Sequence, residues 1–578
     1  MGRCHARMQA DARGSVKVAL ASPFRMGQSP PAVPEPTPIR RPKLDLESAA
    51  RWLAPASLRS TGAAGIRLGR YALCLAIPCW VFWRLSIPML QTALGFDEQV
   101  FVWTGWSVLK GLAPYKDFME WKPPLAFLSH ALALELFGFH GYHFRYFFGF
   151  LSIASIGALL VSLVRRGCDV VICSALGLAM VFLFLYPGLH EAYVADTEAI
   201  GLSYYYFGIA ALIASTRHRA AAEIAGGIFF TCCVLSKEPF AFVVIATWAG
   251  CYFVVNPRFS LPTARHFGTY TTLGVAIAVA VLCLYMVPTG SMAAYVALVR
   301  RYTAMFRDPK SGYCAVLGMF QPTGRFWDDL PAQWQRMHEQ FFNPKTLGWS
   351  APFVAATVVF VPRRSPALFA CALLAIAGSL YGVTATNCYF PHYYVLGESG
   401  VVFFLVVGVD ALGSRLSRAP ASVRLWVQSV MFLTMAMTVW PGVDAASEAA
   451  FKDPPPYPDP VPGALAFVRE HSVAADRIFT TGPAGFYVAT DRRPATSGAP
   501  IVDELLPAMP GKTDAEKLRP LYDQLVSGRP KIVFLDPELH GAIRVTPDRK
   551  RRYMAGAIMP FLTEYKYVKT GEYFYERP

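Results

Sequence analysis

The chain contains 578 residues, of which 54% are hydrophobic and only 16% are charged, and its mean hydropathy is +0.34. A soluble globular protein of this length is less apolar, so the composition excludes that class and indicates an integral membrane protein. The formal net charge of +15 does not indicate a nucleic-acid partner, because the basic residues lie in the N-terminal tail and in short loops between apolar segments. That placement is typical of topology signals and contacts with anionic lipids.

The first 70 residues lack apolar periodicity and include the run SPPAVPEPTPIRRPK. Such a composition cannot bury a core, so it predicts a disordered, basic cytoplasmic tail over residues 1–70. No apolar region of the signal-peptide type precedes residue 71, so we do not expect a cleaved signal peptide.

Apolar segments dominate residues 71–441. A helix that crosses the membrane needs roughly 20 mostly apolar residues, and about eleven segments approach this criterion. They begin near Tyr71, His143, Val170, Ala199, Ile224, Pro239, Phe267, Trp349, Ala367, Val395 and Leu425. The expected fold is therefore an all-α polytopic membrane bundle of about 11 transmembrane helices.

Arginine residues mark alternate connections between these segments. They are Arg165, Arg166, Arg217, Arg219, Arg258, Arg265, Arg363, Arg364, Arg415, Arg418 and Arg424. The positive-inside rule assigns these connections and the N-terminus to the cytoplasm, in a multi-pass protein of the bacterial cytoplasmic (inner) membrane. The outward connections are then 91–142, 188–198, the turn at Lys237, 289–348 and 387–394. An odd number of spans also places the C-terminal region outside.

A change of pattern follows the last apolar segment. Residues 442–463 include DPPPYPDPVPG, which is typical of an extended, proline-rich linker. Beyond it, DRIFTTG and PKIVFLD resemble short buried strands, with helix-like stretches at 462–471 and 514–527. Residues 464–578 are therefore expected to form a small α/β domain outside the membrane.

Two adjacent carboxylates, Asp97 and Glu98, follow the first apolar segment at its outer end. Charged groups near the membrane are costly, so those that topology does not explain are candidates for function. A structural interpretation is equally open, because Asp97 can cap a helix over residues 98–110 and Glu98 favours its first turn.

The other outward connections carry further polar residues. They are Glu191, Asp196 and Glu198 in the second connection, Lys237 at the tip of a hairpin, Arg300 and Arg301 at the start of the long loop, and His392, Tyr393 and Tyr394 in the last turn. Each has a structural alternative, since a lysine can extend to the surface and aromatic residues often form an interfacial belt. Together they predict acids, cations and an aromatic-histidine group at one face of the bundle.

This combination suits displacement at a sugar carbon whose leaving group is a phosphate attached to a membrane lipid. Phosphate leaves readily, but its developing charge must be met by cations or a metal. The attacking hydroxyl must lose a proton, which requires one carboxylate as general base. Direct displacement then inverts the anomeric centre.

The first outward loop resembles that of GT-C membrane glycosyltransferases. The elements of the resemblance are Asp97-Glu98, Gly111, Tyr115, Asp117, Lys122-Pro123-Pro124 and Arg145, in that order along the chain. The pattern is most similar to the bacterial branch that includes protein O-mannosyltransferase-like proteins and lipid A aminoarabinose transferases. The similarity is best over residues 95–165 and continues through Asp196, Lys237 and residues 390–393. In this branch, the short apolar stretch after Lys122 is expected to lie along the membrane interface.

The resemblance implies a role for each matching position. Its donor is a polyprenyl-phosphate-linked sugar, and its acceptor is an envelope glycan, lipid or protein. The implied catalytic residues are Asp97 as general base, Glu98 as its neighbour and Asp196 as the second acidic site. The implied donor-binding residues are Lys237, His392, Tyr393, Lys122 and Tyr115. The resemblance also allows a divalent metal ion, for which it assigns no ligands.

One position departs from the family pattern. Many relatives carry an arginine shortly before the His-Tyr pair, where this chain has Asn387, Cys388 and Tyr389. We expect Arg300 or Arg301 to replace it at the phosphate.

Two other functions remain open from the sequence. A ligase that moves a whole oligosaccharide would keep the fold and enlarge the donor. A transporter or flippase of a lipid-linked sugar would carry its polar residues at mid-bilayer and show paired repeats, neither of which is evident here.

Overall fold

The computed structural model describes most of the chain between residue 56 and the C-terminus. The described residues are 56–91, 94–185, 195–214, 218–307, 331, 335, 350–384, 393–449, 457, 459–497, 514–536 and 554–578. Residues 1–55 of the predicted tail, together with Glu191 and His392, lie outside them. Residues Ala64–Pro578 form one unit of the structure, to which the following description applies.

Every apolar segment predicted from the sequence coincides with a helix. These helices are α2 (Ala56–Gln91), α5 (Phe144–Arg165), α6 (Val170–Leu185), α7 (Thr197–Ile213), α8 (Arg219–Ser236), α9 (Phe240–Val255), α10 (Leu261–Met286), α15 (Ala351–Arg364), α16 (Pro366–Thr384), α17 (Tyr394–Leu416) and α18 (Ala421–Ala449). Within the described ranges, six helices are long and apolar enough to cross a membrane: α5, α8, α10, α16, α17 and α18. The predicted helical membrane fold is confirmed, whereas the count of about eleven spans stays a prediction.

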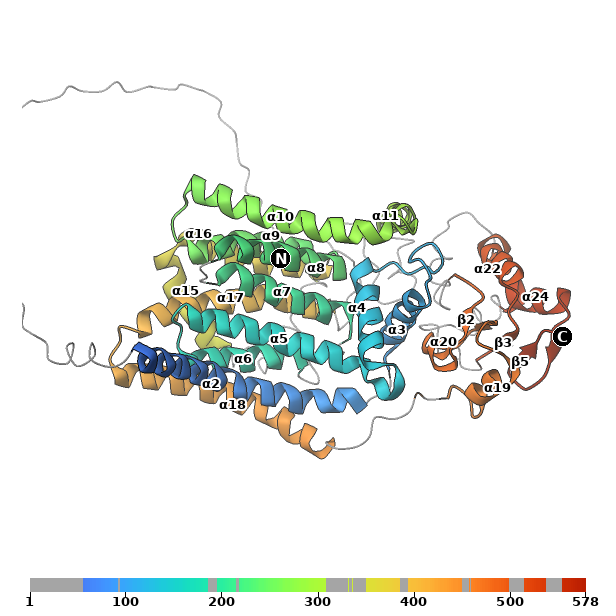
Figure 1. Cartoon of the computed structure of the whole chain (residues 1–578), viewed down its shortest axis with the longest axis horizontal. Coiled ribbons are helices and arrows are strands. Elements are labelled where there is room, and N and C mark those ends of the chain that lie inside the picture. Colours follow the sequence, from blue (N-terminus) through green and yellow to red (C-terminus); the bar gives the residue numbers. More distant parts are fainter. Residues whose placement is uncertain are drawn as a thin grey trace, which may run out of the picture. The chain divides into compact units, whose positions relative to one another are not determined.

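Helix α17 forms the centre of the bundle. Its apolar window is 94% buried, and it packs against α6, α7, α9, α15 and α16. By contrast, the windows of α10 and α18 are only 17% buried. Many of their exposed side chains are apolar, as contact with hydrocarbon favours, and these include Val281, Leu284 and Leu433. Figure 1 shows α5, α7 and α10 running roughly parallel through the bundle.

Glycine allows a close contact between α8 and α10. A Cβ atom at Gly227 would lie 2.1 Å from the backbone oxygen of Thr271, and one at Gly274 would lie 2.1 Å from that of Ile224. The two backbones therefore touch directly. Small residues are typical of such interfaces, because association in lipid depends on van der Waals packing.

Two short helices, α3 (Phe96–Leu109) and α4 (Pro124–Phe137), lie in the predicted first outward loop. Each has 14 residues, a length of about 21 Å at 1.5 Å per residue, which is short of the roughly 30 Å hydrocarbon core. Pro124 occupies the first helical position of α4, and Gly138 ends the helix with a positive φ of 75°. A Cβ at Gly105 would lie 2.6 Å from the Cβ of His130, so α3 and α4 are also in close contact.

The C-terminal region contains a five-stranded sheet of order β2-β1-β3-β5-β4, while the predicted boundaries of an α/β domain over residues 464–578 stay a prediction. The strands are β1 (Arg477–Thr480), β2 (Arg493–Pro494), β3 (Ile532–Phe534), β4 (Val568–Lys569) and β5 (Phe574–Glu576). Strand β1 pairs in parallel with β2 and β3, and β5 pairs antiparallel with β3 and β4. The helices are α19 (Ala464–His471), α20 (Gly485–Thr490), α22 (Asp514–Gly528) and α24 (Met559–Glu564).

This domain contacts the segment that carries α3. At the end of α3, Lys110 Nζ pairs with Asp491 Oδ1 at 2.7 Å, and Arg493 Nη2 donates to the Lys110 oxygen at 3.0 Å. In the loop after α3, the Met119 N–H donates to the Ser497 oxygen at 2.5 Å. In the first turn of α3, Gln99 Oε1 accepts from the Tyr457 hydroxyl at 3.1 Å. The rings of Trp103 and Tyr487 are 6.2 Å apart. The domain therefore holds both the start of α3 and the loop that follows it.

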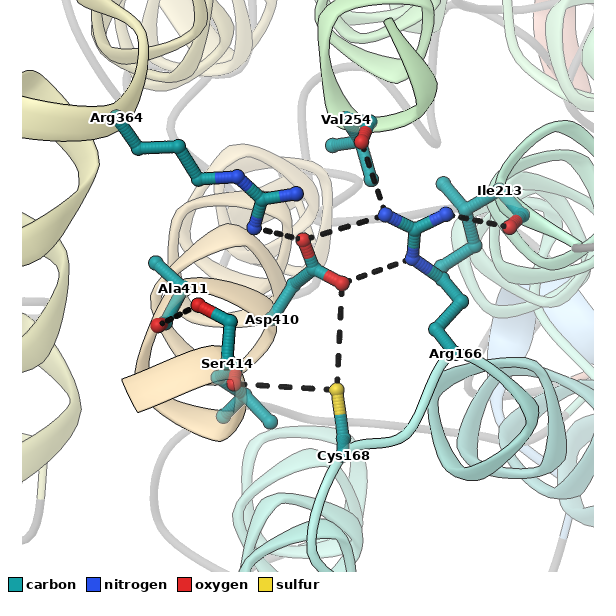
Figure 2. A network of polar contacts seen from close by, with 9 residues as sticks. Arg166, Cys168, Ile213, Val254, Arg364, Asp410, Ala411 and Ser414 are labelled. Carbon is teal, nitrogen blue, oxygen red and sulfur yellow. Dashed lines mark hydrogen bonds and ion pairs between the residues drawn. The ribbon is translucent and has the colours of Figure 1, made fainter. Parts of the chain in front are cut away.

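A buried ionic network joins the helices where α5 ends (Figure 2). Asp410 of α17 accepts from Arg166 Nε at 2.8 Å and from Arg364 Nη1 at 2.6 Å. The Arg166 guanidinium also donates to the backbone oxygens of Val254 at 2.9 Å and Ile213 at 3.4 Å. These carbonyls lie at the ends of α9 and α7, so one arginine satisfies groups that the helices cannot satisfy themselves.

Candidate functional site

The first predicted catalytic pair lies at the beginning of α3. The residue that caps this helix is Gly95, so Asp97 is the second helical residue and the prediction that Asp97 caps the helix is wrong. The backbone N–H of Gly95 donates to Glu98 Oε2 at 3.1 Å, so Glu98 satisfies the helix start instead. The Asp97 side chain is half-buried, whereas that of Glu98 is fully buried.

Glu98 forms a buried ion pair with Arg145 near the start of α5. Arg145 Nη2 lies 2.5 Å from Glu98 Oε2, and Arg145 Nε donates to Oε1 at 3.1 Å. The two side chains are 0% and 1% exposed. This bidentate geometry joins α3 to α5. It fixes the orientation of the turn in which Asp97 lies.

Asp196 lies at the N-cap of α7, and its side chain is 3% exposed. Its Oδ1 atom has no hydrogen-bond partner among the described residues. Burial raises the pKa of Asp196 well above its ordinary value, and repulsion from Asp97, Glu98 and Glu198 raises it further. The structure therefore brings the predicted second acid into electrostatic contact with the first pair, and it favours a protonated carboxyl at Asp196.

Lys237 follows directly on the last residue of α8 and pairs with Glu198 in the first turn of α7. The Nζ atom lies 2.5 Å from Glu198 Oε1, and both side chains are buried. Thr197 donates its hydroxyl to the other Glu198 oxygen at 2.7 Å. The same ammonium lies 4.1 Å from the centre of the Tyr393 ring, which immediately precedes α17. This places the predicted Lys237 and Tyr393 in one site.

Lys122 approaches the same tyrosine from the first loop. Its Nζ atom lies 5.8 Å from the ring centre of Tyr393, 6.0 Å from Phe101 and 5.6 Å from Trp121. Burial lowers the pKa of Lys122, but the electrostatic effects of Tyr393, Glu198 and Asp97, in that order, outweigh it, so the pKa lies well above its ordinary value. Lys122 is therefore a cation held among aromatic rings.

Tyr115 supports the backbone of Lys122. Its hydroxyl donates to the Lys122 carbonyl oxygen at 2.7 Å, and its backbone has a positive φ of 64°, which is uncommon for a tyrosine. The ring lies 4.8 Å from that of Tyr295 in α11 (Ser291–Arg307). Tyr115 thus lies in the site, in a position that shapes the loop.

Glu120 belongs to the site but is missing from the sequence-based prediction. Its side chain is 6% exposed, and burial raises its pKa to about 7, against the opposing effect of Lys122. The signal in the sequence was the position of Glu120 between the apolar residues Phe118, Met119 and Trp121. An acid buried among apolar side chains needs a polar or charged partner.

The remaining predicted residues are less closely defined. Arg300 is exposed on α11, while the side chain of Arg301 and the whole of His392 lie outside the described residues. Within the described ranges, no group of three or more His, Cys, Asp or Glu side chains is arranged to hold a metal ion.

Known proteins resemble this chain in structure. No family model and no curated protein matches it. The Archaeoglobus fulgidus oligosaccharyltransferase in its apo form has a TM-score of 0.50 at 13% sequence identity, covering 88% of this chain and 74% of that chain. Archaeal oligosaccharyltransferase AglB from Archaeoglobus fulgidus, in complex with an inhibitory peptide and a dolichol-phosphate, has a TM-score of 0.48 at 12% identity, with the same coverage. ArnT from Cupriavidus metallidurans in the apo state has a TM-score of 0.45 at 14% sequence identity, and the alignment covers 83% of this chain and 94% of ArnT.

The apo oligosaccharyltransferase is similar to this chain over most of both chains, so the two proteins share a fold. This likeness agrees with the fold that the resemblance over residues 95–165 predicts. The described residues have the fold of the GT-C-type membrane glycosyltransferases.

Proposed function

We propose that this chain transfers a sugar from a polyprenyl-phosphate-linked donor to an envelope glycan, lipid or protein on the outer face of the cytoplasmic membrane, with inversion at the anomeric carbon. The observation that carries the proposal is the convergence of acids and cations on Tyr393. Asp97, Asp196, Lys122 and Lys237 come from separate parts of the chain, and charge interactions or ring contacts connect them.

The carboxylates divide into different roles. Glu98 is held by Arg145, and the raised pKa of Asp196 favours its protonated form at neutral pH. Asp97 is half-buried beside them, at a helix N-terminus where a carboxylate is stabilised. Asp97 is therefore the group best suited to accept the proton of the attacking hydroxyl.

The cations suit the leaving group. As the acceptor oxygen bonds to the anomeric carbon, the bond from that carbon to the phosphate oxygen breaks, and the lipid phosphate leaves with the electron pair. Lys122 and Lys237 approach one tyrosine ring from different elements, so a phosphate beside that ring would contact both ammonium groups. Preorganised charge of this kind stabilises the transition state because it requires no rearrangement during the reaction.

The names of the similar structures agree with a lipid-phosphate ligand. AglB has been solved with a dolichol-phosphate and ArnT with undecaprenyl phosphate. An Archaeoglobus fulgidus oligosaccharyltransferase has also been solved with Zn and sulfate. Since the described residues do not gather three metal ligands, the steps proposed here use only side chains of the protein.

The test is transfer by membranes that contain the wild-type protein or the Asp97→Asn variant. Polyprenyl-phosphate monosaccharides and polyprenyl-linked oligosaccharides serve as separate donors, which distinguishes a glycosyltransferase from an oligosaccharide ligase. Loss of the general base should reduce kcat by about 10²–10⁴-fold. Asp523→Asn, which changes an exposed carboxylate in α22, is the matched control and should leave transfer unchanged. Full transfer by Asp97→Asn would remove the assignment of the base.

A further inference from the structure

Tyr457 connects the proline-rich run before the C-terminal region to the first turn of α3. It is the single aromatic residue of that run, DPPPYPDPVPG at 453–463. Its hydroxyl donates to Gln99 Oε1 at 3.1 Å, and Gln99 Nε2 donates to the Leu94 backbone oxygen at 3.2 Å. The Gln99 amide is therefore held at both ends, by Tyr457 on one side and by the backbone just before Gly95 on the other.

The Tyr457 side chain is itself held by several elements. Its ring lies 5.8 Å from that of Phe139, which follows α4. A Cβ atom at Gly485, the first residue of α20, would lie 2.7 Å from the Tyr457 ring and 3.0 Å from Gln99 Oε1, so α20 begins in close contact with both side chains. Asp459 Oδ1 accepts from a backbone N–H of α19 at 3.1 Å. The hydroxyl therefore approaches Gln99 from a defined position.

Gln99 shares the first turn of α3 with Asp97. Successive residues of an α-helix are about 100° apart around its axis, so these two side chains leave the helix about 200° apart. Glu98, which lies between them in sequence, pairs with Arg145 of α5. One such anchor would leave the turn free to roll about it. The second anchor, from Gln99 to Tyr457, acts on another side of the helix and fixes the direction in which Asp97 is presented.

We propose that Tyr457 is a positioning residue for Asp97 and acts through Gln99. This inference rests on the proposed function, because it assumes that Asp97 accepts the proton of the attacking hydroxyl. A general base must lie within hydrogen-bond reach of that proton, and a misplacement of about 1 Å can lower a rate by about 10²-fold. Tyr457 thereby connects the C-terminal region with the chemical step.

The experiment separates the chemical step from donor binding. Transfer from polyprenyl-phosphate monosaccharides is measured over a range of donor concentrations, in membranes that contain the full chain. Tyr457→Phe removes the hydroxyl and keeps the ring. The matched control is Tyr567→Phe, which removes another half-buried hydroxyl of the C-terminal region, one that donates to the Pro530 oxygen.

Tyr457→Phe should lower kcat by about 10- to 100-fold and leave the donor KM within about twofold, because the predicted donor residues Lys237 and Tyr393 lie on other elements. Tyr567→Phe should change neither. In the Asp97→Asn background, Tyr457→Phe should cause no further loss, since no base remains to be positioned. An unchanged kcat in Tyr457→Phe, or an equal loss in both backgrounds, would overturn the inference.

Hydrogen exchange of α3 tests the contact without any transfer. Amides of residues 96–109 should exchange faster in Tyr457→Phe than in the wild type or Tyr567→Phe, because the start of the helix loses an anchor. Gln99→Met breaks the same bond from the other side, so it decides the question if Tyr457→Phe does not fold.

The proposed function fails separately from this inference. If the wild type transfers no sugar from any polyprenyl-phosphate donor, the enzyme assignment is wrong whatever the exchange of α3 shows. If the wild type transfers sugar, and both kcat and hydrogen exchange are the same in Tyr457→Phe, only the role of Tyr457 is wrong.

Discussion

The ammonium nitrogen of Lys237 lies 4.1 Å above the ring of Tyr393 while it pairs with Glu198 at 2.5 Å. The same ring lies 5.8 Å from the ammonium nitrogen of Lys122. One aromatic side chain at the N-cap of α17 therefore contacts two lysines that come from different predicted outward connections. A ring face attracts a cation without neutralising it, so the contact with Tyr393 positions both lysines while Lys237 also pairs with Glu198.

Replacing Tyr393 with Leu should weaken donor binding. A desolvated cation–π contact contributes about 2 kcal/mol, so loss of the ring should raise the donor KM by up to about thirtyfold. Tyr393→Phe keeps the ring face and should lie within a few-fold of the wild type. Steady-state transfer kinetics measure both. Equal KM values for the Leu and Phe variants would show that the ring does not hold the lysines in place.

Removing Arg145 should destabilise the fold. Arg145→Met leaves the Glu98 carboxylate charged and buried without its guanidinium, a change that costs about 3–5 kcal/mol. Arg519→Met, which breaks the exposed pair with Asp523 in α22, is the matched control and should cost at most about 1 kcal/mol. Thermal unfolding in detergent compares the two variants. Similar losses in both would contradict a structural role for the Glu98–Arg145 pair.

The Asp410 network should contribute to stability but not to transfer. Asp410→Asn removes the negative charge that Arg166 and Arg364 share, so we expect a loss of about 3 kcal/mol or more. The network (Figure 2) lies where α5 ends. Arg145 of the site lies near the start of α5. The donor KM should therefore be unchanged when transfer is measured well below the unfolding temperature. A selective change in KM would connect this end of the bundle to the site.

The stability of the protein should depend on pH through Asp196. Burial, then repulsion from nearby carboxylates, raises its pKa in the folded state above the unfolded value. Its contribution to stability is therefore present below the ordinary pKa of an aspartate, near 3.9, and is lost as the pH rises through the raised folded value. Asp196→Asn removes this dependence and keeps a residue that caps helices equally well.

The expected result is a melting temperature for Asp196→Asn that exceeds that of the wild type by an increasing margin as the pH rises. Thermal unfolding at several pH values above about 4 measures this difference. A constant difference would mean that Asp196 is already ionised in the folded protein, and it could then compete with Asp97 as the base.

Much of the fold follows from local properties of the sequence. Each predicted apolar segment contains a helix, because a backbone in lipid must satisfy its own hydrogen bonds. The α/β domain follows from the two apolar runs that became β1 and β3. Asp97 is an exception. One of its two interpretations was a helix cap, but the cap is Gly95, two residues earlier, where Glu98 accepts from the Gly95 N–H.

The sequence by itself determined that Asp97, Asp196, Lys122, Lys237 and Tyr393 are unusual, because charged and aromatic groups beside apolar segments require a reason. Only the tertiary structure decided which of them meet and which partner each has. Glu98 pairs with Arg145, Glu198 pairs with Lys237, and Glu120 is buried beside Lys122. The first two pairings depend on how α3 packs near α5 and α7 near the end of α8, because the paired side chains are far apart in the chain and only the packing brings them together.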